Sequence, residues 1–170
     1  MSEHYVIAAN AAAARFFRLE APEFPELESG PVLVEDYKMQ NPEAEMPGRD
    51  VFSAPKSGRN REPVGGSGAG HGYDDHREEH RREMEKQFAE KVGGAVARRA
   101  GRLGASRVIL VATARMLGLL RSSCGEALGR RGLTLLEYDG DLVNLSPTDI
   151  QRHLARKQLV PPKKPPQGMS

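Results

Sequence analysis

The clearest strand in the sequence is Arg107-Val108-Ile109-Leu110-Val111-Ala112. Its apolar residues do not alternate with polar ones, which is typical of an internal parallel strand covered on both faces. Before it, apolar residues recur every four positions and predict a long helix over 73–102. After it we expect a helix from Thr113, a strand over 132–138 and a helix over 147–156. This alternation favours an α/β fold in a single domain.

The N-terminal part of the sequence predicts three further strands. They cover residues 5–9, 14–19 and 32–37, where short apolar runs are bounded by polar or proline-rich segments. Short connections favour an antiparallel meander. The expected order is βββ–long loop–αβαβα, with a mixed sheet in one domain over residues 1–156.

Residues 39–72 form the long loop in this interpretation. They hold seven glycines and four prolines among 34 residues and few large apolar side chains. Such a segment cannot bury enough surface to offset its ordering entropy, so we expect a flexible loop. Loops of this length in compact domains are usually functional or disordered. The Pro- and Lys-rich tail, residues 157–170, is also expected to be mobile.

Composition narrows the class of protein. The chain has 170 residues and a formal net charge of +2, and it contains no apolar run of 18 residues, so no membrane span is predicted. Glu3 stands where a secretory signal needs basic residues, which favours a cytoplasmic location. The single cysteine, Cys124, excludes a disulfide within the chain and a cysteine-based zinc cage.

Charge is unevenly distributed along the chain. Residues 1–47 hold 3 basic and 9 acidic residues, whereas residues 48–72 hold 4 basic and 2 acidic. The arginines of the second segment, Arg49, Arg59 and Arg61, are therefore candidates for contact with a polyanion such as RNA. The alternative is ordinary solvated charge in a loop.

Histidines and carboxylates gather where the long helix is expected to begin. His76 and His80 share a helix face, with Glu79 beside them and His71 just upstream. Two helical histidines with a third ligand can hold a divalent metal, although the order differs from the zincin motif H-E-x-x-H. The alternative is a solvated first turn, in which Asp75 caps the helix.

A second carboxylate group follows the last predicted strand. Asp139 and Asp141, together with Asp75 and Glu79, can form a cluster of the kind that binds Mg²⁺. The alternative is that Asp139-Gly140-Asp141 is a turn. The hypothesis of a metal-dependent hydrolase or nuclease therefore uses Asp75, His76, Glu79 and Asp139.

The glycine-rich core of the loop is Gly65-Gly66-Ser67-Gly68-Ala69-Gly70. Backbone N–H groups of such a run can hold phosphate, but the lysine and Ser/Thr of a P-loop are missing. Ser67 and His71 are four apart, a spacing that fixes no catalytic geometry in a flexible loop. A loop that reaches a partner fits better.

The order and spacing of several motifs resemble the bacterial host-attachment protein family over about residues 4–155. The stretches that carry the resemblance are Val6-Ile7-Ala8-Ala9-Asn10, Ala14-Arg15-Phe16-Phe17, Pro47-Gly48-Arg49-Asp50-Val51-Phe52, Asp75-His76-Arg77-Glu78-Glu79, Val108-Ile109-Leu110-Val111-Ala112, Met116-Leu117-Gly118-Leu119-Leu120, Asp139-Gly140-Asp141-Leu142-Val143-Asn144-Leu145-Ser146-Pro147 and His153-Leu154. Asn10 stands where that family commonly has aspartate.

That family in turn resembles the middle domain of eukaryotic and archaeal class-1 peptide-release factors and Pelota. The resemblance implies an RNase H-like fold with a glycine-rich loop before a long helix. In release factors this loop carries Gly-Gly-Gln, whereas the corresponding stretch here is Gly65-Gly66-Ser67. Without the glutamine, peptidyl-tRNA hydrolysis is not expected.

The main hypothesis is a non-enzymatic intracellular binding module that acts on the ribosome or RNA. Alternatives are the metal-dependent hydrolase and a factor in attachment to host cells, acting indirectly. No catalytic residue, metal, cofactor or membrane contact is assigned in the main hypothesis. Its binding residues are Arg49, Arg59, Arg61, Gly65, Gly66, Ser67, His71, Asp75, His76 and Glu79.

Overall fold

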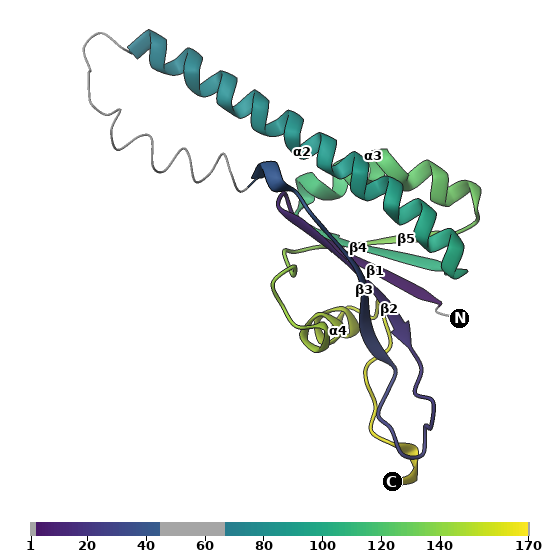
Figure 1. The fold of residues 1–170 in the computed structure, drawn as a ribbon. Coiled ribbons are helices and arrows are strands. Elements are labelled where there is room, and N and C mark those ends of the chain that lie inside the picture. Colours follow the sequence, from purple (N-terminus) through teal and green to yellow (C-terminus); the bar gives the residue numbers. More distant parts are fainter. Residues whose placement is uncertain (1–2, 45–66, 170) are drawn as a thin grey trace.

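The computed structural model describes residues 3–44 and 67–169 of the chain. They form a five-stranded mixed sheet with helices on both faces (Figure 1). The elements are β1 (His4–Ala9), β2 (Ala13–Glu20), β3 (Val32–Gln40), α2 (Ser67–Leu103), β4 (Arg107–Ala112), α3 (Ala114–Arg130), β5 (Thr134–Asp139), α4 (Pro147–Arg156) and a 3-10 turn, Gln167–Met169.

The sheet confirms the predicted strand arrangement. Its order is β3-β2-β1-β4-β5. Strands β1, β2 and β3 pair antiparallel as a meander, while β4 pairs parallel with β1 and with β5. The apolar run of β4 is thus an internal strand, and all of its residues after Arg107 are buried.

Alternating side chains of the central strands supply two hydrophobic cores. On one face Tyr5 and Ile7 pack with the second half of α2 and with α3. On the other face Val6 and Ala8 pack with α4. Because successive residues of a strand point to opposite faces, a strand as short as β1 contributes to both cores. The protein is therefore a three-layered α/β domain (Figure 1).

Helix α2 begins earlier than the sequence predicts. It starts at Ser67, so Asp75 lies in its third turn and does not cap it. Residues 67–72 of the predicted loop belong to this helix, and Met39 and Gln40 belong to β3. Residues 45–66 lie outside the described residues. Residues 42–44, which follow β3, are helical as well, so they also differ from the predicted loop.

The glycine pair Gly93-Gly94 does not end α2. A Cβ at Gly93 would lie 2.0 Å from Ser123 Oγ, so the missing side chain lets α3 approach the backbone of α2. Ser123 Oγ also donates a hydrogen bond to the carbonyl of Ala89 at 3.2 Å. The structure thus shows close packing of α2 and α3 at Gly93.

The C-terminal tail differs from its predicted mobility. Val160 is buried beside α4 in the second core. Beyond it, Lys164 exchanges two backbone hydrogen bonds of 2.9 Å with Gly30, and the Gln167 amide donates to the Pro25 carbonyl. The tail lies along the β2–β3 hairpin at the lower end of the molecule (Figure 1). The burial of Val160 and the pairing with Gly30 hold the tail against the body. Neither contact can be predicted from the composition of the tail.

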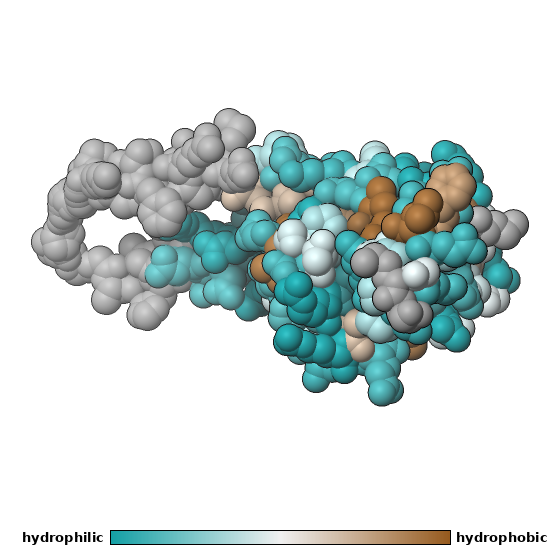
Figure 2. Space-filling view, turned by 90° about the horizontal axis from the view of Figure 1, so that it is seen from below, coloured by the Kyte–Doolittle hydropathy of each residue, from teal (hydrophilic) through white to brown (hydrophobic). Residues whose placement is uncertain are grey.

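The surface at this end of the molecule is largely hydrophilic, with a small group of hydrophobic side chains (Figure 2). Among the described residues, the large hydrophobic side chains that are exposed are Phe24, Leu27 and Tyr37. No helix within residues 3–44 and 67–169 is both long and apolar enough to cross a membrane.

Candidate functional site

Helix α2 has two halves with different surroundings. Residues 67–83, which we call the arm, extend beyond the sheet and away from the other helices (Figure 1). From Asp74 to Glu83 every side chain is exposed except Arg77, which is half-buried. Residues 84–103, the packed half, lie over the sheet, and Phe88 is the first fully packed side chain.

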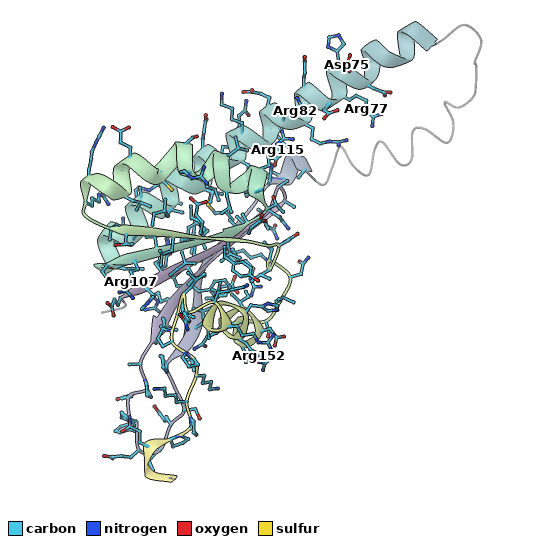
Figure 3. The ribbon with its side chains drawn as sticks, turned by 180° about the vertical axis from the view of Figure 1, so that it is seen from behind. Asp75, Arg77, Arg82, Arg107, Arg115 and Arg152 are labelled. Carbon is cyan, nitrogen blue, oxygen red and sulfur yellow. The ribbon has the colours of Figure 1, made fainter. Side chains whose placement is uncertain are left out.

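An ion pair marks the point where α2 leaves the body. Arg115, at the start of α3, lies 3.4 Å from Glu85 of α2. Arg115 follows the carboxyl end of β4, so the arm projects past that edge of the sheet. Figure 3 shows Asp75, Arg77 and Arg82 on the arm, farther from the sheet than Arg115.

The arm is polar around its whole circumference. Residues 74–83 include three arginines, five carboxylates and two histidines, a net charge of −2 with neutral histidines. Arg82 pairs with Glu78 at 2.8 Å, one helical turn away. A helix without an apolar stripe has no face to pack on its own domain, and such helices often act as solvent-exposed bridges or spacers. Its acidic balance also makes the arm itself a poor ligand for RNA.

A recess lies at the opposite end of α2. It has a volume of about 730 Å³ and is formed where α2 and α3 end and β4 and β5 begin. We call it the arginine recess because three arginines line it. Its lining residues are Arg98, Ala100, Gly101, Arg102, Gly104, Ala105, Arg131 and Leu133.

One arginine of the recess is fixed by the backbone of α2. Arg131 donates a hydrogen bond from Nη1 to the carbonyl of Ala97 at 2.6 Å. A Cβ at Gly101 would lie 2.0 Å from the same nitrogen, so the guanidinium lies against the helix where a side chain is missing. Arg98 and Arg102 are exposed.

These two sites lie within a region that matches a known family of proteins. A family model described as "protein required for attachment to host cells" matches residues 5–154. The match covers both ends of α2 and all five strands. The chain belongs to this host-attachment family. No curated protein matches the sequence significantly.

The host-attachment match includes the residues predicted for a metal site, but the structure does not bring them together. Asp75, His76 and Glu79 are exposed on the arm, and Asp139 is exposed at the end of β5. Within residues 3–44 and 67–169, no three His, Cys, Asp or Glu side chains are grouped to hold a metal ion. The geometry therefore gives the hydrolase hypothesis no support.

The other predicted binding residues of this family member lie largely outside the described part. Arg49, Arg59, Arg61, Gly65 and Gly66 fall within residues 45–66. Ser67 and His71 belong to the first turns of α2, where the backbone is described. Their roles remain predictions.

The carboxyl ends of the parallel strands are occupied by polar groups with structural roles. Asn10 Oδ1 accepts hydrogen bonds from the amides of Ala12 and Ala13 at 2.9 Å and tightens the β1–β2 turn. Arg15 donates to the carbonyls of Val143 and Leu145 at 2.7 and 2.6 Å and holds the segment after β5 on the sheet. In open α/β sheets this edge commonly binds ligands, and here Asn10 and Arg15 use their polar groups in contacts within the protein.

Cys124 has no catalytic environment in this family member. Its side chain is buried under α2, and burial raises the pKa of the thiol to about 11. The thiolate is the nucleophilic form of cysteine, so this residue is inert at neutral pH. Cys124 is therefore a packing residue of the core between α3 and α2.

Sequence reasoning did not find the arginine recess. Its arginines come from the ends of two helices about thirty positions apart, and each one reads as an ordinary basic residue near a helix C-terminus. The sequence feature that could have indicated the recess is the glycines near its arginines: Gly101 and Gly104 flank Arg102, and Gly132 follows Arg131.

Proposed function

We propose that this host-attachment family member is a non-enzymatic binding module that acts on the ribosome or its RNA. The observation that carries the proposal is the arm, whose side chains from Asp74 to Glu83 are exposed except for the half-buried Arg77. The proposal includes an RNase H-like fold similar to the middle domain of release factors, with which the five-stranded mixed sheet is compatible.

The length of the arm supports a role in presentation. At about 1.5 Å per residue, the seventeen residues 67–83 place the first turn of α2 roughly 25 Å from the point where the helix meets the body. Gly65 and Gly66 immediately precede that turn in the sequence. A spacer of this kind delivers a short segment into a recess of a large partner while the domain stays outside.

Charge assigns the RNA contact to the segment before the arm. The arm has a net charge of −2, whereas residues 48–66 carry Arg49, Lys56, Arg59 and Arg61 against two carboxylates. Arginines bind phosphate through paired donors, so these residues are the proposed RNA contacts. We further propose a cytoplasmic location and an indirect contribution to host attachment, exerted through the ribosome or RNA.

The test is co-sedimentation with ribosomes at increasing salt. Wild-type protein should pellet with ribosomes at low salt and be released as salt rises. The variant Arg49→Ala/Arg59→Ala/Arg61→Ala should bind weakly, and the slope of log K against log salt should fall by about 2–3 as three phosphate contacts are lost.

A matched variant controls for loss of charge. Arg107→Ala/Arg121→Ala/Arg130→Ala removes three exposed arginines of the body and should pellet like the wild type. A wild-type protein that does not pellet, or equal loss of binding in the two triple variants, would contradict the proposal.

A further inference from the structure

We propose that the arginine recess binds a phosphorylated small molecule of nucleotide size. This site is separate from the arm and does not depend on binding to the ribosome.

The recess collects arginines that have no acidic partner within the described chain. Arg98 and Arg102 make no hydrogen bond or ion pair there, and Arg131 donates only to a backbone carbonyl. Elsewhere in the described chain, arginines are commonly paired with carboxylates. The paired ones are Arg15, Arg18, Arg82, Arg99, Arg115, Arg121, Arg130 and Arg152.

The recess contains no lining carboxylate, and three arginines contribute to its wall. An anion in the recess would be attracted by the net positive charge of this wall. A phosphate group offers oxygen acceptors that match the paired donors of arginine, which makes phosphate the expected anion.

Helix ends normally present free carbonyls, which repel anions. Here two of the carbonyls in the last turn of α2 accept hydrogen bonds from the backbone that follows. The Ala105 amide donates to the Ala100 carbonyl at 3.2 Å, and the Gly104 amide donates to the Gly101 carbonyl at 3.3 Å. Gly104 has φ of 69°, the left-handed conformation that permits this closure. The Ala97 carbonyl, one turn earlier, accepts a hydrogen bond from Arg131, so three carbonyls near the recess are already engaged.

The size of the recess indicates an organic ligand. Its volume of about 730 Å³ falls in the range of small-molecule sites, roughly 300–1,000 Å³. Ala100, Ala105 and Leu133 give it an apolar wall beside the arginines. A phosphate among the guanidinium groups thus leaves room for an apolar or aromatic group, such as a nucleobase, against that wall.

The recess and the arm are at opposite ends of α2. Arg98 lies fifteen positions beyond Glu83, the last residue of the arm, which is more than about 20 Å along a helix. Arg107, at the start of β4, labels this end of the molecule in Figure 3, with Asp75 at the other end. A ligand of nucleotide size in the recess therefore does not reach the arm.

The test is calorimetric titration of the full chain with inorganic phosphate, a nucleoside monophosphate, the corresponding nucleoside and a long single-stranded RNA. We expect the monophosphate to bind more tightly than inorganic phosphate, and the nucleoside to bind at least about ten-fold more weakly than the monophosphate. Binding of the long RNA without binding of the monophosphate would overturn the proposal.

Two variants locate the site. Arg98→Ala/Arg102→Ala should weaken binding of the monophosphate by about ten-fold or more, because it removes the two arginines that have no structural contact. Arg81→Ala/Arg115→Ala removes the same charge from the arm and from the start of α3, far from the recess, and should change the affinity less than about two-fold.

A third variant keeps the charge of the recess. In Gly101→Ala the new Cβ occupies the place of the Arg131 guanidinium, so the monophosphate should bind more weakly although no arginine is lost. The proposal is overturned if wild-type protein binds no monophosphate, or if the two arginine variants lose affinity equally. Co-sedimentation with ribosomes is not expected to change in Arg98→Ala/Arg102→Ala. Failure of the proposed recess site can therefore be distinguished from failure of the proposed ribosome binding.

Discussion

The two halves of α2 follow the same helical geometry but are stabilised differently. In the packed half, Phe88, Val92 and Val96 point into the core below the helix. In the arm, the described side chains are charged or polar, and Arg82 forms an exposed ion pair with Glu78. An exposed pair at this spacing contributes about 0.3–0.5 kcal/mol, whereas burial of one large apolar side chain contributes about 1.5–3 kcal/mol.

This difference shows that helical structure and packing are separate properties of α2. A helix polar on all sides gains little by lying on its own domain, so it remains free to contact something else. The packed half stabilises the fold, and the arm extends beyond the domain. Substitutions in the two halves should therefore affect different measurements.

The largest effect is expected from Phe88→Ala in the packed half. Phe88 is 4% exposed, and its truncation should cost about 3–5 kcal/mol through lost burial and a residual cavity. Arg81→Ala on the arm should change stability by less than about 0.5 kcal/mol. Urea unfolding followed by circular dichroism measures both, and a similar loss in the two variants would show that the arm is packed after all.

A smaller effect is expected from the adjacent glycines of the packed half. Gly93→Ala places a Cβ 2.0 Å from Ser123 Oγ and 2.8 Å from Ser123 Cβ, and such overpacking costs about 1–3 kcal/mol. Gly94→Ala meets only the flexible end of Arg98, at 3.3 Å, and should stabilise the protein by up to about 1 kcal/mol through helix propensity.

The same urea experiment compares the two alanine variants. If Gly93→Ala is as stable as Gly94→Ala, then α2 and α3 are not in close contact at Ser123. That result would remove the main difference between the packed half and the arm.

The smallest effect concerns pH and lies at the edge of the body farthest from the arm. Burial lowers the pKa of His4 from 6.5, Arg107 lowers it further, and Glu3 partly opposes them. Folding therefore favours neutral His4. Its contribution to the free energy of unfolding is complete above about pH 6.5, the unfolded pKa, and is lost as the pH falls from 6.5 toward the lower pKa of the folded state.

Stability of the wild type should thus decrease between pH 7.5 and pH 5, and His4→Gln should show a shallower decrease. Urea unfolding at a series of pH values measures this difference. Identical slopes for the two proteins would contradict the burial of a neutral His4.

Local patterns predicted most of the fold. The apolar runs of β1 and β4 predict buried strands. Ser146-Pro147 marks the start of α4, where the Ser146 hydroxyl accepts a hydrogen bond from the Asp149 amide at 3.1 Å. The start of α2 was placed too late because glycines at 68, 70 and 72 have low helix propensity and Asp75 resembles a cap. The tail was missed because its pairing with Gly30 is non-local.

The candidate sites were harder to predict than the fold. The sequence located the histidines and carboxylates of the arm, but their spacing along a helix could not show that Asp139 would stay apart from them. The arginine recess depends on how the ends of two helices meet, and on Gly101 leaving space for Arg131. That arrangement is a property of tertiary packing, which periodicity does not encode.

The most direct test of the account is hydrogen exchange along α2, measured in the free protein and with ribosomes. In the free protein, amides of the packed half should exchange slowly and those of residues 74–83 rapidly, because the arm has few buried contacts to oppose local opening. Added ribosomes should slow exchange in the arm and leave the amides around Arg98 and Arg102 unchanged. Equal protection of both halves in the free protein would contradict the account. So would exchange rates in the arm that do not change when ribosomes are added.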